Sequence, residues 1–247
     1  MCSSDLSFYP LAGTLTTLFA WVAILLAVPG LYMGFAVAPT DAQQGESYRI
    51  IFIHVPAAWM AMFIYLVIAF WSILSLALNA RLPSMMAQAL APTGALFAFI
   101  ALWTGAFWGR PTWGTYWVWD ARLTSTLVLL FLYLGLIALR SAIDDPRRAD
   151  RACALLALVG VVNIPIIYFS VRWWNTLHQG ATISMTAAPK MAQTMLTAML
   201  LMTFSAWAYA IATAFHRVRT IIVEREALTD WVGRAIDPVG PGTERAP

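Results

Sequence analysis

Charge is what this sequence has least of. Of its 247 residues, 11% are Asp, Glu, Lys or Arg, 61% are hydrophobic, and the mean hydropathy is +0.72. A soluble domain carries roughly 25% charged residues. So little charge does not cover a water-facing surface. The composition therefore excludes an ordinary soluble globular protein and predicts a surface that largely faces lipid.

Other features are missing as well. The only cysteines are Cys2 and Cys153, and no CxxC or CxxCH motif occurs, which excludes a metal knuckle, a dithiol redox pair and a covalent haem attachment site on this chain. The alternating ten-residue segments of a membrane β-barrel are absent too. No nucleophile, carboxylate pair or metal cluster suggests bond-making chemistry, so we expect a protein that is not an enzyme.

Long uncharged stretches dominate what is present. Six of them lie at 6–40, 50–80, 82–109, 123–139, 152–171 and 191–216. A helix needs about 20 apolar residues to cross the hydrocarbon core, and backbone groups in lipid must be satisfied within the segment. The sequence therefore predicts an all-α, polytopic membrane protein with six transmembrane helices, at about 14–37, 51–78, 86–108, 123–140, 152–171 and 190–215. The first lacks a positive n-region and is too long for a cleaved signal peptide.

The distribution of Lys and Arg predicts the orientation. Six spans place both termini on one side, and that side holds ten of the fifteen basic residues, four of them in the short turn 140–151. The positive-inside rule assigns this side to the cytoplasm. We expect a transmembrane domain at 1–220, a cytoplasmic tail at 221–247, and a Trp-rich periplasmic loop at 108–122.

Histidine is scarce, with three residues in the whole chain. Six alternating spans place His54 and His178 on the periplasmic side and His216 on the other. Two imidazoles on one side suit the two faces of one iron porphyrin, since imidazole is a common axial ligand of haem iron. A lone histidine near a span end is more often an interfacial residue than a ligand. Both interpretations stay open at this point.

Tryptophan is concentrated on the side of His54 and His178. Six of the twelve tryptophans lie in the links of that side, and the other side's links hold one, Trp231. An aromatic belt would enrich both membrane interfaces. A platform for a flat, largely apolar ligand would gather indoles on one face. The pattern alone leaves the belt and the platform about equally supported.

Two arginines accompany these aromatic and imidazole groups. Arg49 precedes His54, and Arg122 follows the Trp-rich run. The guanidinium fork matches a carboxylate such as a porphyrin propionate, although the same side chains also extend to lipid headgroups. Asp120 is suited to cap the next helix or to form an ion pair of little energy with Arg122.

Three stretches carry a resemblance to a known family. The run Trp113-Gly-Thr-Tyr-Trp-Val-Trp-Asp120, continued by Ala-Arg-Leu-Thr-Ser, resembles the WWD signature of haem-handling membrane proteins. Residues 52–59 around His54 and residues 163–180 around His178 resemble the same family. With six spans and this length, the chain is identified as a member of the CcmC family of cytochrome c maturation. One departure is Tyr116, where some relatives carry Trp.

The resemblance implies a function and partners. Haem b, as a transient cargo, would be bound at the periplasmic face of the bacterial inner membrane and presented to the haem chaperone CcmE. CcmD and the ABC transporter formed by CcmA and CcmB would be further partners, with no nucleic acid. Site residues carry over as axial ligands (His54, His178), platform and docking residues (Trp113, Trp117, Trp119, Asp120), propionate partners (Arg49, Arg122) and supporting aromatics (Trp59, Trp108, Tyr116, Trp173, Trp174).

Two other functions remain as alternatives. One is a transporter that moves haem or another solute through its own bundle, for which ionisable or broken-helix sites near the midplane are typical. The polar features within a span are few here, and the pair Asn163 and Pro165 is the main one. The other alternative is a scaffold subunit of an ABC transporter that binds no ligand.

Overall fold

The computed structural model describes residues 3–178, 191–229 and 231–233, and within them the predicted fold class is confirmed. Six helical segments of this part of the chain are long and apolar enough to cross a membrane. The elements are α1 (Ser3–Tyr32), the π-helical η1 (Met33–Val37), the 3-10 helix η2 (Glu46–Ile50), α2 (Ile51–Leu78), α3 (Arg81–Trp113), α4 (Ala121–Ala142), α5 (Pro146–Gly160), α6 (Asn163–Trp173) and α7 (Gln193–Arg225).

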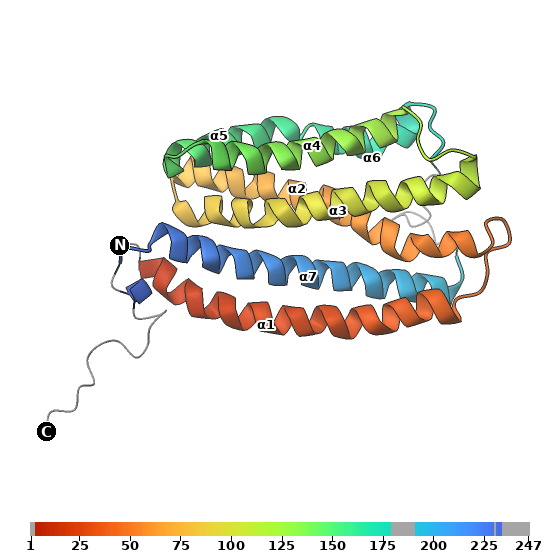
Figure 1. Ribbon diagram of the computed structural model, residues 1–247, viewed down its shortest axis with the longest axis horizontal. Helices are drawn as coiled ribbons and strands as arrows, with labels where there is room; N and C mark the ends of the chain where they lie inside the picture. The colour runs from red at the N-terminus through yellow and green to blue at the C-terminus, as the bar shows by residue number, and fades with distance from the viewer. Residues whose placement is uncertain (1–2, 179–190, 230, 234–247) are drawn as a thin grey trace, which may run out of the picture.

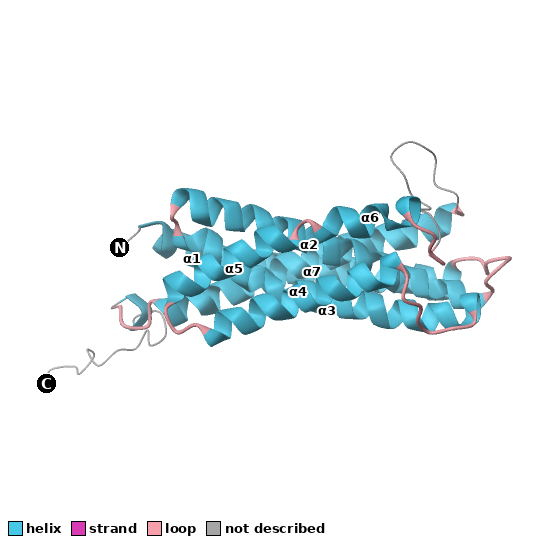
Figure 2. Cartoon of the chain, turned by 90° about the horizontal axis from the view of Figure 1, so that it is seen from above, coloured by secondary structure: helices cyan, strands magenta, loops and turns pink. Residues whose placement is uncertain are grey.

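The helices run roughly side by side along one long axis (Figure 1). α1 and α7 form a pair along one side, and α2 to α6 form a larger group next to it, as the view from above also shows (Figure 2). The links 38–45, 114–120 and 174–178 gather at one end, which we call the histidine end. α1 begins and α7 ends at the opposite end, as six alternating spans require.

Local sequence signals explain several helix boundaries. Asp120 caps α4, because its carboxylate accepts the backbone N–H of Leu123 at 2.8 Å. Asp145 caps α5 in the same way, through the N–H of Arg148 at 2.7 Å, and Pro146 occupies the first helical position, where no N–H is needed. Gly114 ends α3 with a φ of 79°, the left-handed conformation that glycine adopts without strain.

Two expected boundaries differ from the structure. The segment 108–122 was expected to be a loop, but α3 continues through its first part to Trp113, because the helix stop is Gly114. α7 continues past the predicted domain boundary to Arg225, whose guanidinium forms an ion pair with Asp150 at 2.7 Å. The expected tail beyond residue 233 lies outside the described residues.

The fifth span is broken at Val161 and Val162, between α5 and α6. Pro165 has no N–H, so the carbonyl of Val161 receives no bond from the usual helical donor. It accepts instead from the N–H of Ile164 at 3.0 Å. The side-chain amide of Asn163 donates to the Ser125 carbonyl at 2.9 Å and joins the break to α4. The pair that stood out in the sequence therefore forms a kink that is tied to its neighbour.

Two tyrosines fill the middle of the bundle, and we call them the tyrosine layer. Tyr65 of α2 and Tyr133 of α4 are fully buried and meet edge to face, with ring centres 5.2 Å apart. A Cβ on Gly160 would lie 2.1 Å from Tyr65, and one on Gly94 would lie 2.1 Å from Tyr133. Only glycine leaves room for these rings, so the packing at this level is tight.

Candidate functional site

A cavity of about 780 Å³ opens at the histidine end of the bundle. Its walls come from α2, α3, the start of α4, α6 and the region before and within the first turns of α7, and residues 40–44 lie across it. Both predicted ligand histidines line it, with Arg122, Trp59, Trp108 and Trp113. Its size lies within the range of about 300–1,000 Å³ that is usual for sites of small molecules and cofactors.

Four rings form a continuous row in this cavity. The ring centres of His54 and His178 are 6.1 Å apart, although the two residues are distant in sequence. Trp108 lies edge-on to His54 at 5.6 Å, and Trp113 lies edge-on to His178 at 6.0 Å. The last turns of α3 therefore supply an indole to each imidazole, and the structure brings these four predicted residues together.

The environment of His178 favours an uncharged imidazole. Burial lowers the pKa of His178 to about 4, and the positive charge of Arg122 lowers it further in the same direction. At neutral pH the ring therefore keeps a lone pair on one nitrogen. A neutral imidazole is the form that binds metals.

The number of ligands limits the kind of metal that this site suits. Within the residues that the structure describes, no three side chains of His, Cys, Asp or Glu come together as a metal site. Zinc sites usually take three or four protein ligands. Two imidazoles suit an iron that already carries four nitrogen ligands, which is the case in a porphyrin.

The two predicted propionate partners differ in position. Arg122 lines the cavity and donates through Nη1 to the carbonyl of Ile167 at 2.7 Å, which joins α4 to α6. Arg49 is not among the lining residues. It pairs with Glu46, donates to the Gly34 carbonyl at 2.7 Å, and lies over the ring of Tyr48. The structure thus brings Arg122 to the histidines and uses Arg49 to hold the preceding link.

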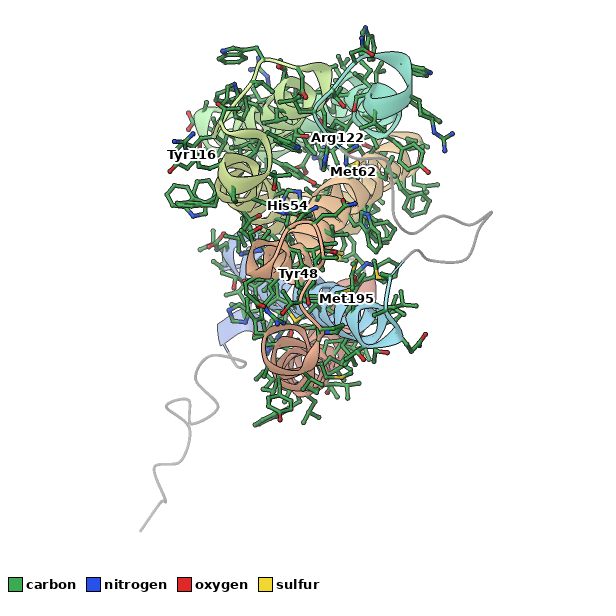
Figure 3. The ribbon with its side chains drawn as sticks, turned by 90° about the vertical axis from the view of Figure 1, so that its right-hand side faces the viewer. Tyr48, His54, Met62, Tyr116, Arg122 and Met195 are labelled. Carbon is green, nitrogen blue, oxygen red and sulfur yellow. The ribbon has the colours of Figure 1, made fainter. Side chains whose placement is uncertain are left out.

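The WWD segment divides into an inner and an outer part. Trp113 faces the cavity, whereas Trp119 is 77% exposed and Tyr116 is 55% exposed. Figure 3 looks onto the histidine end and shows Tyr116 at the edge of the molecule, with His54 and Arg122 nearer the middle. Trp117 packs edge to face on Trp119, with ring centres 5.4 Å apart. The outer rings do not line the cavity.

The remaining predicted residues lie around these two parts. Asp120 caps α4, and within the described residues it forms no ion pair with Arg122. Trp173 and Trp174, at the end of α6, are both half exposed and lie outside the cavity lining. Trp59 contributes to the wall. His216 lies in α7 and lines a second cavity, of about 770 Å³, between the helices toward the opposite end.

Sequence reasoning missed two groups of lining residues. Gln44 accepts a hydrogen bond from Nε1 of Trp108 at 2.7 Å and so fastens the link 38–45 across the cavity. No motif marks Gln44. The second group is a methionine wall made of Met191, Met195 and Met199. Their spacing of four places Met195 and Met199 on one helix face, a signal that the sequence did contain.

A family comparison places the chain in a known family. Residues 2–233 match the family model described as Heme exporter protein C. The chain belongs to the Heme exporter protein C family. The match covers all three stretches that carried the resemblance, so the predicted family is confirmed.

Individual relatives support the same membership across bacteria and plants. A Heme exporter protein C of Escherichia coli K12 is 45% identical over 232 residues, which is 92% of each chain. One from Bradyrhizobium diazoefficiens is 48% identical over 214 residues, 87% of this chain and 81% of the relative. A CcmC-like mitochondrial protein of Marchantia polymorpha is 48% identical over 166 residues. Membership in the Heme exporter protein C family supports a role in haem export and cytochrome c maturation for this multi-pass membrane protein.

Proposed function

We propose that the chain binds haem in the cavity at the histidine end, with His54 and His178 as axial ligands, and presents it to the chaperone CcmE. The observation that carries the proposal is the 6.1 Å separation of the two imidazole centres. Imidazole nitrogens bind first-row metals at about 2 Å, so two axial imidazoles on one metal place their ring centres about 6 Å apart. The separation therefore suits one iron between two rings.

The rest of the cavity suits the porphyrin. Trp108 and Trp113 provide apolar surface beside the two imidazoles, and the methionine wall adds a pliant, polarisable surface to the cavity. In this proposal Arg122 binds a propionate with guanidinium N–H groups other than the one given to Ile167. Arg49 reaches a propionate only by exchanging its bond to Glu46, which makes it the weaker partner.

The outer part of the WWD segment suits a protein partner. Trp119 and Tyr116 present large aromatic surfaces to the outside, next to the cavity but apart from its lining. Exposed aromatic side chains are enriched at protein interfaces. We therefore divide the predicted residues into Trp113, which contacts haem, and Trp119 with Tyr116, which contact the chaperone, while Trp117 packs beneath Trp119.

The setting of this function follows from orientation and family. The histidine end faces the periplasm of a bacterial inner membrane if the basic turn 140–151 lies in the cytoplasm. Haem b is then a cargo that is held and passed on, and the chain works as a binding and transfer protein beside CcmD, CcmA and CcmB. The chain's own contribution is to hold and orient haem while a vinyl group meets the chaperone histidine.

The packing of the bundle bears on the rival transporter function. Ala61 and Leu129 line the histidine-end cavity, whereas Ile68 and Leu136 line the second cavity. The tyrosine layer lies between these levels of α2 and α4, and its rings are clamped against glycines. Within the described part of the bundle this tightly packed layer stands between the two cavities, so the geometry favours binding at one face.

The test is the absorption spectrum of the detergent-purified protein, oxidised and reduced, after addition of haem. We expect a Soret band with the α and β bands of low-spin, bis-histidine iron. The His54→Ala/His178→Ala variant should lose these bands. His216→Ala is the matched control, because His216 lies toward the opposite end and should leave the spectrum unchanged. A wild type that stays colourless with added haem would refute the proposal and favour the scaffold function.

A further inference from the structure

The ring of His54 lies in a slot on the surface of α3. Its Nδ1 is 3.0 Å from the hydroxyl oxygen of Thr104, and its Cε1 would be 3.0 Å from a Cβ on Gly105. Trp108 closes the slot one turn further along, edge-on at 5.6 Å. His54 is 8% exposed, and these neighbours on α3 flank its ring, with the backbone of Ala101 on the same helix as a further hydrogen-bond partner.

The hydrogen bonds of Thr104 decide which nitrogen of His54 carries the proton. A threonine hydroxyl has one hydrogen to donate and two lone pairs to accept with. That hydrogen goes to the carbonyl of Ile100, one turn back in α3, at 2.6 Å. The contact with His54 therefore has the imidazole as donor, which places the ring proton on Nδ1. Nε2 is left with the lone pair.

We infer that Thr104 is a positioning residue that sets the tautomer and the angle of His54, so that Nε2 is the nitrogen offered to iron, and that Gly105 leaves the space which the ring needs. The role of this tautomer in haem binding rests on the proposed function, but the tautomer itself is a property of the protein without haem. Metal-binding histidines generally donate their second ring N–H to such an acceptor, which orients the ring and makes the ligand more basic. The Ile100 carbonyl accepts the Thr104 hydroxyl hydrogen and so fixes the orientation of this hydroxyl in turn.

Loss of the Thr104 hydroxyl should change the haem site in ways that loss of a merely structural threonine would not. Without the Thr104 hydroxyl, the imidazole loses its side-chain acceptor at Nδ1, and the form with its proton on Nε2, where it blocks the metal, becomes more populated. The bound ligand is also a weaker electron donor, because its Nδ1–H is no longer polarised. Ferric iron gains more from a basic ligand than ferrous iron does, so losing the acceptor raises the reduction potential of bound haem.

The first test needs no haem. Protein labelled with ¹⁵N in histidine contains three imidazoles, which His178→Ala and His216→Ala variants assign. We expect the His54 spectrum to show a protonated Nδ1 and an unprotonated Nε2. Thr104→Val, which keeps the shape and removes the hydroxyl, should abolish this preference, and Thr104→Ser should keep it. A wild type with the proton on Nε2, or a Thr104→Val spectrum like the wild type, would overturn the inference.

The second test uses haem titration and redox potentiometry. Replacing the outer partner of a metal ligand typically costs about tenfold to a hundredfold in affinity, and we expect a loss of that size in Thr104→Val with a more positive potential. Thr16→Val is the matched control, because the Thr16 hydroxyl makes the same bond one turn back in α1, to Ala12 at 2.8 Å, and neither residue lines either of the two cavities, so affinity and potential should equal those of the wild type.

A further variant tests the slot even if Thr104→Val does not fold. Gly105→Ala keeps the hydroxyl but pushes on the ring, so it should lower affinity while leaving the tautomer unchanged. If the wild type binds no haem, the proposed function fails while the tautomer result stands. If the wild type shows the bis-histidine spectrum and Thr104→Val matches its affinity and potential, the inference fails and the proposed function stands.

Discussion

The hydrogen bond between Gln44 and Trp108 allows a quantitative prediction of the rate at which haem dissociates. Nε1 of Trp108 donates to the side-chain oxygen of Gln44 at 2.7 Å, and this bond joins the link 38–45 to the end of α3 across the cavity. Asp41 supports the link from within, because its carboxylate accepts the backbone N–H of Gln44 at 2.8 Å. Gln44→Ala removes the bond across the cavity and keeps the support within the link.

The expected size of the effect follows from the strength of one such bond. A neutral hydrogen bond contributes about 1 kcal/mol net, which is about a fivefold change in an equilibrium. If haem leaves when the link opens, the open population and the dissociation rate both rise about fivefold in Gln44→Ala. Transfer of haem from the loaded protein to excess apomyoglobin, followed by stopped-flow absorbance, measures this rate directly.

Gln43→Ala is the control for this experiment. Gln43 is the neighbouring amide residue, and its backbone N–H is held by the same Asp41 carboxylate at 2.9 Å, but its side chain does not bind Trp108. We expect its dissociation rate to equal that of the wild type. Equal rates in Gln44→Ala and the wild type, or equal acceleration in both variants, would show that the bond does not close the cavity.

Three further predictions concern other parts of the molecule. Burial lowers the pKa of His178 to about 4, so haem affinity measured by titration should fall less than about twofold from pH 7 to pH 5, whereas a histidine with an ordinary pKa of about 6.5 would lose about 25-fold. Trp119→Ala should keep the haem spectrum and affinity but slow haem transfer to CcmE in a reconstituted assay, and equal transfer rates would remove Trp119 from the docking surface. Gly160→Ala should destabilise the protein by about 1–3 kcal/mol in detergent unfolding, because its Cβ overlaps the Tyr65 hydroxyl, and Tyr65→Phe in the same chain should recover most of the loss. An unaltered unfolding midpoint in Gly160→Ala would contradict the tight packing.

The fold followed from the sequence because charge is so unevenly distributed. Uncharged stretches of membrane length can only be helices in lipid, so six spans and their alternation needed no further information. The boundaries are harder to predict, since lipid-facing composition changes gradually. α3 was expected to end near Trp108, but Gly114 is the residue that ends it, and this extends the helix far enough to place Trp113 beside His178.

The site was predictable where residue type alone decides the chemistry. His54 and His178 stood out because histidine is rare and parity placed both on one side, and the structure brings their rings together. Arg49 shows the limit of this reasoning. Its local pair with Glu46 and its bond to the Gly34 carbonyl depend on how the link folds back, which spacing does not reveal. Thr104 and Gly105 were missed for the same reason, because neither residue type suggests haem.

The tyrosine layer separates the bundle into two ends that should respond to mutation independently. Between the second cavity and the histidines, Tyr65 and Tyr133 fill the space between α2 and α4, and each ring is confined by a glycine. Substitutions at sites that share no partner usually have additive effects on free energy, and those around one rigid contact do not. We therefore expect the free-energy effects of substitutions at the two ends to add. We expect this additivity to fail when Gly94 or Gly160 is also replaced.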